Sequence, residues 1–114
     1  NFSSCIEVYS KKVTTRANHY HKKDKHFIYI ISGEILYFYK DRKKGSKVHT
    51  KKMKKGDLFF TPEMQEHMAY FLKHTHFLAF STRKRTKFDY EKDLIRINMK
   101  RYPDVKKAIL KNRK

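Results

Sequence analysis

The chain of 114 residues has only one cysteine, two prolines and three glycines, and it has no tryptophan. A single cysteine excludes an internal disulfide, so we expect Cys5 to be a small buried apolar side chain. A reducing, cytoplasmic setting is the simplest expectation from this cysteine content. Because prolines and glycines are so few, each one is expected to mark a turn that the fold requires.

Long hydrophobic runs are also missing. No apolar segment approaches the ~20 residues that cross a bilayer, and no signal peptide is recognisable, so we expect no membrane partner. The hydrophobic content of 39% and the aromatic content of 15% suffice for an ordered core. The length of 114 residues predicts one domain over 1–114. Because the first residue is Asn rather than Met, this domain could be a fragment of a longer chain.

Acidic residues are scarce: 11 Asp and Glu stand against 29 Lys and Arg, which gives a formal charge of +18. A field of this sign attracts anions, and an anionic small molecule is the partner that we expect. The basic residues are scattered and no known nucleic-acid-binding motif accompanies them, so we do not expect a nucleic-acid partner. The alternative explanation is a lysine-rich solvated surface that reflects the codon usage of the genome.

The chain does contain many short apolar and β-branched segments, separated by polar turns, and this pattern predicts strands. The expected strands cover residues 5–9, 13–21, 26–31, 34–39, 47–53, 58–61, 67–72, 76–81 and 93–97. Lysines indicate that 47–53 lies at a sheet edge. A basic loop is expected over 82–87, and Pro103 predicts a short helix over 104–111. The fold class is therefore all-β, a sandwich or barrel with a short C-terminal helix.

Ser32-Gly33 separates two of these strands and predicts a two-residue hairpin turn in which Gly33 has a positive φ. His19 and His21 stand two residues apart in the expected strand 13–21, so both point to the same side of a sheet. The same alternation adds three residues to that face: Val13, Thr15 and Ala17. Two imidazoles on one face favour a cavity that binds a ligand or a metal.

The spacing of the histidines resembles the first motif of the cupin family. His19-x-His21 is followed after four residues by His26, which stands where the family has a Glu ligand, and after six more residues by Gly33. A second block, with Gly56, Pro62 and His67, keeps the spacing of the second cupin motif. The resemblance covers about residues 13–81. It departs from the family pattern at four positions, which hold Val13 for Gly, His26 for Glu, Met64 for Gly and Phe71 for Asn.

The cupin resemblance implies a jelly-roll barrel, or double-stranded β-helix, and a homodimer that pairs through its sheets. It also implies a metal site at the mouth of the barrel, with His19, His21, His26 and His67 as ligands. Imidazole suits a divalent transition metal: Zn, Ni, Fe or Cu. The remaining histidines lie outside the motifs, and we expect surface or core positions for His49, His74 and His76.

A second resemblance is local. The string Arg16-x-x-His19-x-His21-Lys22 resembles the Arg-Gly-x-His-Ala-His-Lys block of the dTDP-4-keto-6-deoxy-sugar 3,4-ketoisomerases, which are cupins without a required metal. It implies that a histidine of this block moves a proton between carbons beside a keto group. Arg16 would neutralise the diphosphate or position the sugar. Imidazole titrates near neutrality and can serve as base and then acid. Ala17 stands where that family has Gly.

The leading hypothesis is a small cupin that binds or isomerises a nucleotide-activated sugar in surface-polysaccharide synthesis. A metal-dependent cupin enzyme of another class, such as an oxygenase, is one alternative. A non-enzymatic module that binds a small ligand is another, so whether the chain is an enzyme stays open. Five tyrosines are interpreted as ordinary strand residues: Tyr20, Tyr29, Tyr37, Tyr39 and Tyr70.

Overall fold

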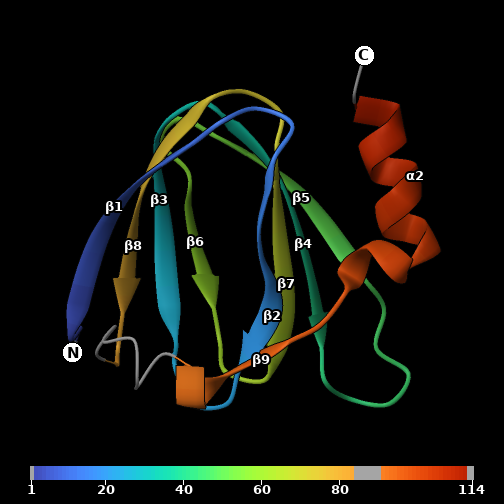
Figure 1. Cartoon of the computed structure of the whole chain (residues 1–114), viewed down its shortest axis with the longest axis horizontal. Coiled ribbons are helices and arrows are strands. Elements are labelled where there is room, and N and C mark those ends of the chain that lie inside the picture. The colour runs from blue at the N-terminus through green and yellow to red at the C-terminus, as the bar shows by residue number, and fades with distance from the viewer. Residues whose placement is uncertain (1, 84–90, 113–114) are drawn as a thin grey trace.

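The computed structural model describes residues 2–83 and 91–112, and within them nine strands form two antiparallel sheets that face each other (Figure 1). The smaller sheet has the order β1-β8-β3-β6 and the larger sheet has the order β5-β4-β7-β2-β9. The strands are β1 (Ser4–Ser10), β2 (Thr15–His21), β3 (His26–Ser32), β4 (Glu34–Asp41), β5 (His49–Lys54), β6 (Leu58–Thr61), β7 (Gln65–Phe71), β8 (Thr75–Ser81) and β9 (Leu94–Arg96).

This architecture confirms the predicted all-β jelly roll with a C-terminal helix. β5 is an edge strand, as its lysines predicted. A 3₁₀ turn, η1 (Met99–Arg101), leads into α2 (Pro103–Asn112), where Pro103 takes the first helical position. None of the helices in the described part of the chain is long and apolar enough to cross a membrane. The expected basic loop over 82–87 lies outside the described residues beyond position 83.

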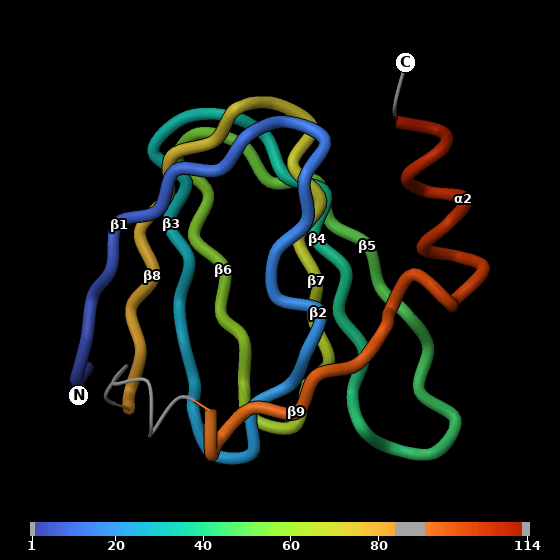
Figure 2. Tube along the Cα trace, viewed as in Figure 1, coloured from blue at the N-terminus to red at the C-terminus, as the bar shows by residue number. Residues whose placement is uncertain are grey.

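The hairpin predicted at Ser32-Gly33 is wrong, because β3 and β4 belong to different sheets. Gly33 is the corner where the chain crosses between them, and its φ of +101° confirms the predicted positive value. A Cβ on Gly33 would overlap the neighbouring strand, with Thr75 Cα 2.6 Å away. Figure 2 shows this crossing beside those of β1–β2 and β7–β8, all arching over the same end of the two sheets.

Strand β2 begins two residues later than predicted and contains a bulge, so it does not alternate regularly. Val13 lies outside the strand with a φ of 67°, and Ala17 and Asn18 have φ values of 68° and 65°. The register against β7 shifts between Ala17 and His19. Strict alternation from Val13 to His21 is therefore wrong. A bulge bends its strand and re-aims side chains, and His19 and His21 follow this one.

Two apolar cores hold the sheets in place. The first lies between the sheets and includes Ile30, Phe71 and Phe77. The second covers the outer face of the larger sheet, where Met99 and Val105 bring η1 and α2 against it. Among the described residues, the outer face of the smaller sheet has no such cluster, although Phe2 packs there against Phe27 and Phe80. Its outward side chains include Glu7, Tyr9, Phe27, Tyr29, Ile31, Leu58, Phe60, His76, Leu78 and Phe80, of which Leu58 is 58% exposed.

Cys5 also lies on this outer face, and the prediction that it is buried is wrong. It stands on β1, an edge strand whose Val8 and Ser10 point inward. Because side chains alternate along a strand, the odd-numbered Cys5 points to solvent beside Phe80 on β8.

Candidate functional site

The two sheets bring four histidines together in one buried cluster. His19 and His21 come from β2, His67 from the adjacent β7, and His26 from β3 in the opposite sheet. All four are buried, and His19 is the most exposed of them at 7%. Their ring centres lie 4.7 Å apart for His19 and His67, and 5.1 Å apart for His26 and His67. The structure thus places side by side the four histidines that the sequence singled out.

Asp93 orients His21. The Nδ1 atom of His21 lies 3.1 Å from Asp93 Oδ2 in a buried contact. Because a carboxylate accepts, Nδ1 carries the proton and Nε2 is the basic nitrogen of the neutral ring. The same carboxylate accepts from the backbone N–H groups of Lys23, at 2.8 Å, and Asp24, at 3.1 Å. These bonds fix the orientation of the Asp93 carboxylate as well as that of the imidazole.

His67 is oriented in the same way by the backbone. Its Nδ1 lies 3.0 Å from the carbonyl oxygen of Gln65, to which it donates. The basic nitrogen of the neutral His67 ring is therefore Nε2. The planes of His21 and His67 are close to parallel, at 17°, with their centres 5.8 Å apart. Two imidazoles with fixed tautomers are suited to proton transfer, and equally to holding a metal.

Asp24 is a second buried carboxylate beside the cluster, 3% exposed. Its Oδ1 accepts from Thr82 N, Thr82 Oγ1 and Arg83 N, each at 3.2 Å. Asp24 lies in the turn before β3, and these hydrogen bonds hold that turn against the residues that follow β8. It also joins His21 and His26 in a group whose ligand-capable atoms all lie within 4.8 Å of one another.

The donor atoms fit a metal ion. His19, His21 and His67 form a second group whose ligand-capable atoms lie within 4.8 Å of one another. Histidines that ligate a metal generally donate their other N–H to a carboxylate or a carbonyl, as His21 and His67 do here. Three imidazoles with a nearby carboxylate suit the divalent transition metals. These clusters could therefore hold a metal ion.

A cavity of about 130 Å³ opens beside the cluster, between the two sheets. Arg16 lies on its rim, exposed to solvent, with its Nε bonded to Ser10 Oγ at 2.6 Å. Both Arg16 and Ala17 line the cavity. In a regular strand two consecutive side chains point to opposite faces, and the bulge in β2 allows both to reach the same cavity. The apolar wall includes Ile28 and Phe77. Arg16, predicted beside the histidines, therefore shares their cavity.

Tyr37 is the polar residue of this cavity that sequence interpretation passed over as an ordinary strand residue. It is 1% exposed, and its hydroxyl lies 2.6 Å from Thr61 Oγ1. Burial raises the pKa of Tyr37, so the phenol stays protonated far above neutral pH. The cavity therefore contains a neutral hydroxyl as well as imidazoles.

The other three histidines lie outside the cluster, as expected. His76 bonds Glu7 at 2.7 Å and stacks on Tyr9. His49 stacks on Tyr39 at the edge of the larger sheet, and His74 Nδ1 accepts from the backbone of Lys12.

No model of a known protein family matches the chain, and no curated protein sequence matches it. Solved structures do match. The capsular polysaccharide assembling protein CapF from Staphylococcus aureus has a TM-score of 0.74 at 13% identity, over 83% of this chain and 27% of that one. The dTDP-6-deoxy-D-glucose-3,5-epimerase RmlC from Legionella pneumophila, in complex with dTDP-4-keto-L-rhamnose, has 0.72 at 18% identity, over 87% and 55%. These neighbours are cupin-fold proteins. The chain has the cupin fold.

A 3,4-ketoisomerase from Helicobacter canadensis is a further structure similar to this cupin domain, with a TM-score of 0.70 at 14% identity, over 83% of this chain and 68% of that one. The domain spans about a quarter of the CapF chain and about half of the RmlC chain. At such low identity the likeness concerns the fold. It agrees with the cupin resemblance that the histidine spacing carried.

Proposed function

We propose that this cupin domain binds a nucleotide-activated keto-sugar and isomerises or epimerises it by moving a proton on carbon. The buried pair of His21 and Asp93 beside a cavity carries this proposal. The structural neighbours support it at the level of the fold, because epimerases and ketoisomerases of dTDP-sugars are among them. Synthesis of surface polysaccharide, in the cytoplasm, is the setting that we propose for this reaction.

His21 acts as the base in this mechanism. Its Nε2 takes the proton from the carbon next to the keto group, and the electron pair of the broken C–H bond moves onto the keto oxygen. Asp93 then faces an imidazolium and stabilises its charge. In epimerisation the proton returns to the same carbon and the original carbonyl reforms. In isomerisation the protonated ring gives the proton to the former carbonyl carbon, the hydroxyl on the first carbon passes its proton to the enolate oxygen, and a new carbonyl forms at the first carbon. His19, next to His21 with ring centres 4.8 Å apart, is the second candidate for one of the two transfers.

Arg16 and Tyr37 bind substrate oxygens in this proposal. Arg16 lies on the rim with a guanidinium that suits a phosphate or sugar oxygen. Tyr37, kept protonated by burial, offers a hydroxyl inside the cavity. A volume of about 130 Å³ is below the ~300–1,000 Å³ of a pocket for a whole drug-sized ligand. The cavity therefore takes the sugar ring, and the nucleotide lies outside it.

Deuterium exchange tests the proposal. The protein is incubated in deuterated water with a panel of nucleotide keto-sugars, and NMR follows the C–H positions next to the keto group. We expect exchange with at least one member, and its loss in the double variant His19→Ala/His21→Ala with the fold retained. Absence of exchange and of product with every member contradicts the proposal.

A metal-dependent cupin enzyme of another class, such as an oxygenase, is the second candidate. The convergence of His19, His21 and His67, two of them with oriented Nδ1 protons, favours it. Bound Zn, Ni, Fe or Cu would supply Lewis-acid or redox chemistry, while the histidines hold it and the apolar wall limits water. Elemental analysis of the purified protein, followed by oxygen uptake, distinguishes this candidate from the first.

We further propose that two copies pair through the outer face of the smaller sheet. The outward side chains of its strands within the described residues include no Lys or Arg, although the chain carries a charge of +18. The positive charge on the rest of the surface makes two copies of the chain repel each other. At the outer face of the smaller sheet they can instead pack together and bury Phe60 and Leu58. Light scattering should give a dimer that Leu58→Lys dissociates. Leu110→Lys, at a leucine 65% exposed on α2, is the matched control.

A further inference from the structure

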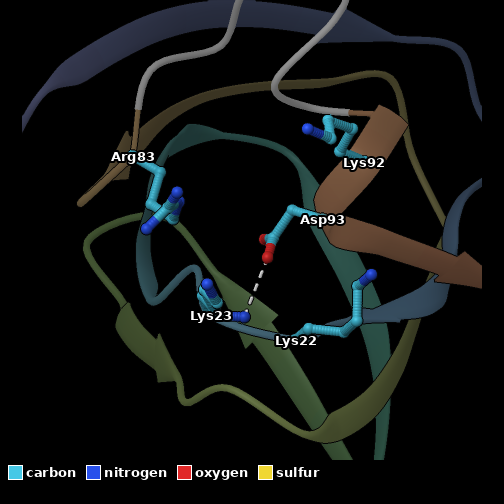
Figure 3. Close-up of a pocket in the computed structure, with 5 residues that line it drawn as sticks. All are labelled: Lys22, Lys23, Arg83, Lys92 and Asp93. Carbon is cyan, nitrogen blue, oxygen red and sulfur yellow. Dashed lines mark hydrogen bonds between the residues drawn. The ribbon is translucent and has the colours of Figure 1, made fainter.

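A second pocket, of about 220 Å³, lies outside the histidine cavity, and the described residues that line it are four cations and one carboxylate. Figure 3 shows Asp93 at its centre, with Lys22 and Lys23 on one side and Arg83 and Lys92 on the others. Lys22 and Lys23 follow His21 directly along the chain, and Arg83 follows β8. The pocket therefore shares Asp93 with the candidate active site while facing solvent.

The backbone beneath these cations is fixed by buried carboxylates. Lys23 N donates to Asp93 Oδ1 at 2.8 Å, and Lys22 N donates to the Asp93 carbonyl at 2.9 Å. Arg83 N donates to the buried Asp24 at 3.2 Å. The segment 22–24 is thereby locked to Arg83 and to Asp93, which lie about 60 and 70 positions further along the chain. Side chains that project from a locked backbone lose less freedom when they bind a ligand.

The described lining of this pocket is strongly basic. Among these lining residues four cations stand beside one carboxylate, a net formal charge of three positive units. The Asp93 oxygens already accept from His21, Lys23 N and Asp24 N, so they are engaged by donors other than the cationic side chains. Among the residues that the structure describes, Lys22, Lys23 and Arg83 form no ion pair with a carboxylate. Such a concave site focuses a positive field and favours a compact anion of high charge.

We propose that this pocket is a binding site for a phosphate or diphosphate group. Arg83 offers a planar fork that matches phosphate oxygens, and the lysines add mobile point charges. Asp93 contributes repulsion at the base of the pocket, which directs the anion toward the rim rather than the bottom. The charge and the fixed backbone support the site by themselves. Only the assignment of the anion to the substrate's diphosphate rests on the proposed function.

Isothermal titration with inorganic pyrophosphate tests the site, at ~0.15 M salt so that distant surface charge is screened. We expect saturable binding of one pyrophosphate per chain. Arg83→Gln and Lys22→Gln should each weaken it about tenfold, as expected for loss of one charge-assisted hydrogen bond. Lys22→Arg should keep the affinity. Lys44→Gln, in the exposed loop after β4, removes the same charge elsewhere and should change the affinity less than about twofold.

Thymidine diphosphate as a second titrant distinguishes two sources of the anion. If Arg83→Gln weakens both titrants alike, the pocket takes the diphosphate of a nucleotide sugar. If it weakens pyrophosphate alone, the pocket takes a separate phosphate compound. Absence of saturable binding, or equal losses in Lys44→Gln and Lys22→Gln, overturns the site. None of these measurements needs turnover, so a failed deuterium-exchange assay leaves their outcome unaffected.

Discussion

His21 and Asp93 are 72 positions apart in the chain, and their side chains meet in a buried contact of 3.1 Å. The carboxylate holds the proton on Nδ1 and leaves Nε2 as the basic nitrogen. It accepts two backbone N–H groups as well, so it cannot turn away from the ring. The chemistry proposed for the cavity depends on this pair.

Asp93→Asn should lower the rate of deuterium exchange by at least ~100-fold with little change in KM, because the amide can impose the wrong tautomer and cannot stabilise an imidazolium. If a metal is bound instead, the same variant should weaken its affinity by ~10–100-fold. NMR exchange rates and elemental analysis measure the two effects. Asp104→Asn, in the first turn of α2, is the matched control. A rate and a metal content both unchanged in Asp93→Asn would show that the pair is structural.

Gly33→Val should destabilise the fold by more than about 1 kcal/mol. Two causes add here: a φ of +101°, and overlap of the new Cβ with the backbone at Thr75. Gly45→Val is the matched control, because Gly45 has a φ of +84° but nothing within 4 Å of its Cβ position. Urea unfolding of both variants separates strain from overlap. Equal losses would mean that β8 shifts to accommodate the side chain.

The sequence located the histidines but not Asp93, the carboxylate that orients His21. Histidine spacing is a local signal, and it placed His19, His21, His26 and His67 at one site. Asp93 lies beyond the last motif and approaches only because β9 pairs with β2. Likewise, Ser32-Gly33 signalled a turn correctly, but a turn signal does not tell whether the next strand joins the same sheet. Long-range pairing, which no local pattern encodes, decided both points.

The departures from the motif glycines have a common structural outcome. Val13, Ala17 and Met64 stand where the resembled motifs have Gly, and all three keep a positive φ: 67°, 68° and 58°. The fold imposes the left-handed conformation on residues that disfavour it. The motif glycines therefore indicated the positive φ at these three positions correctly, although other residues now occupy them.

Val13→Gly should accordingly raise the free energy of unfolding by about 1 kcal/mol. A β-branched residue with a φ of 67° is strained, and Val13 is 57% exposed, so little burial is lost. The gain is reduced by the larger entropy of glycine in the unfolded chain. Thr50→Gly, at an exposed β-branched residue of β5, should instead destabilise. A loss of stability in Val13→Gly would show that the valine side chain contributes contacts that outweigh the strain.

Because Tyr37 is buried, we expect the free energy of unfolding to depend on pH in the alkaline range. Burial raises its pKa above the ordinary value of 10.0, so at high pH the native state holds a proton that the unfolded state has lost. The stabilising contribution is complete below pH 10 and is lost as the pH rises further. The free energy of unfolding should therefore fall as the pH rises above about 10, and fall less in Tyr37→Phe. Tyr29→Phe, at an exposed tyrosine, should retain the wild-type dependence.

His26→Glu distinguishes metal chemistry from metal-free proton transfer. His26 occupies the position of the cupin carboxylate ligand, with its ring 5.6 Å from His21 and 5.1 Å from His67. If a metal is bound, the variant should keep one but shift its preference from Zn, Cu or Ni toward harder ions such as Mn.

If the site works without metal, the new carboxylate favours protonated imidazole in its neighbours. A base must be unprotonated to act, so the acidic limb of the pH–rate profile should move to higher pH. His76→Glu, at a histidine outside the cluster, should alter neither measurement. Metal content and pH profile that are both unchanged in His26→Glu would remove His26 from the site. Its ring contacts with His21 and His67 would then serve packing alone, and the remaining three histidines would carry the chemistry.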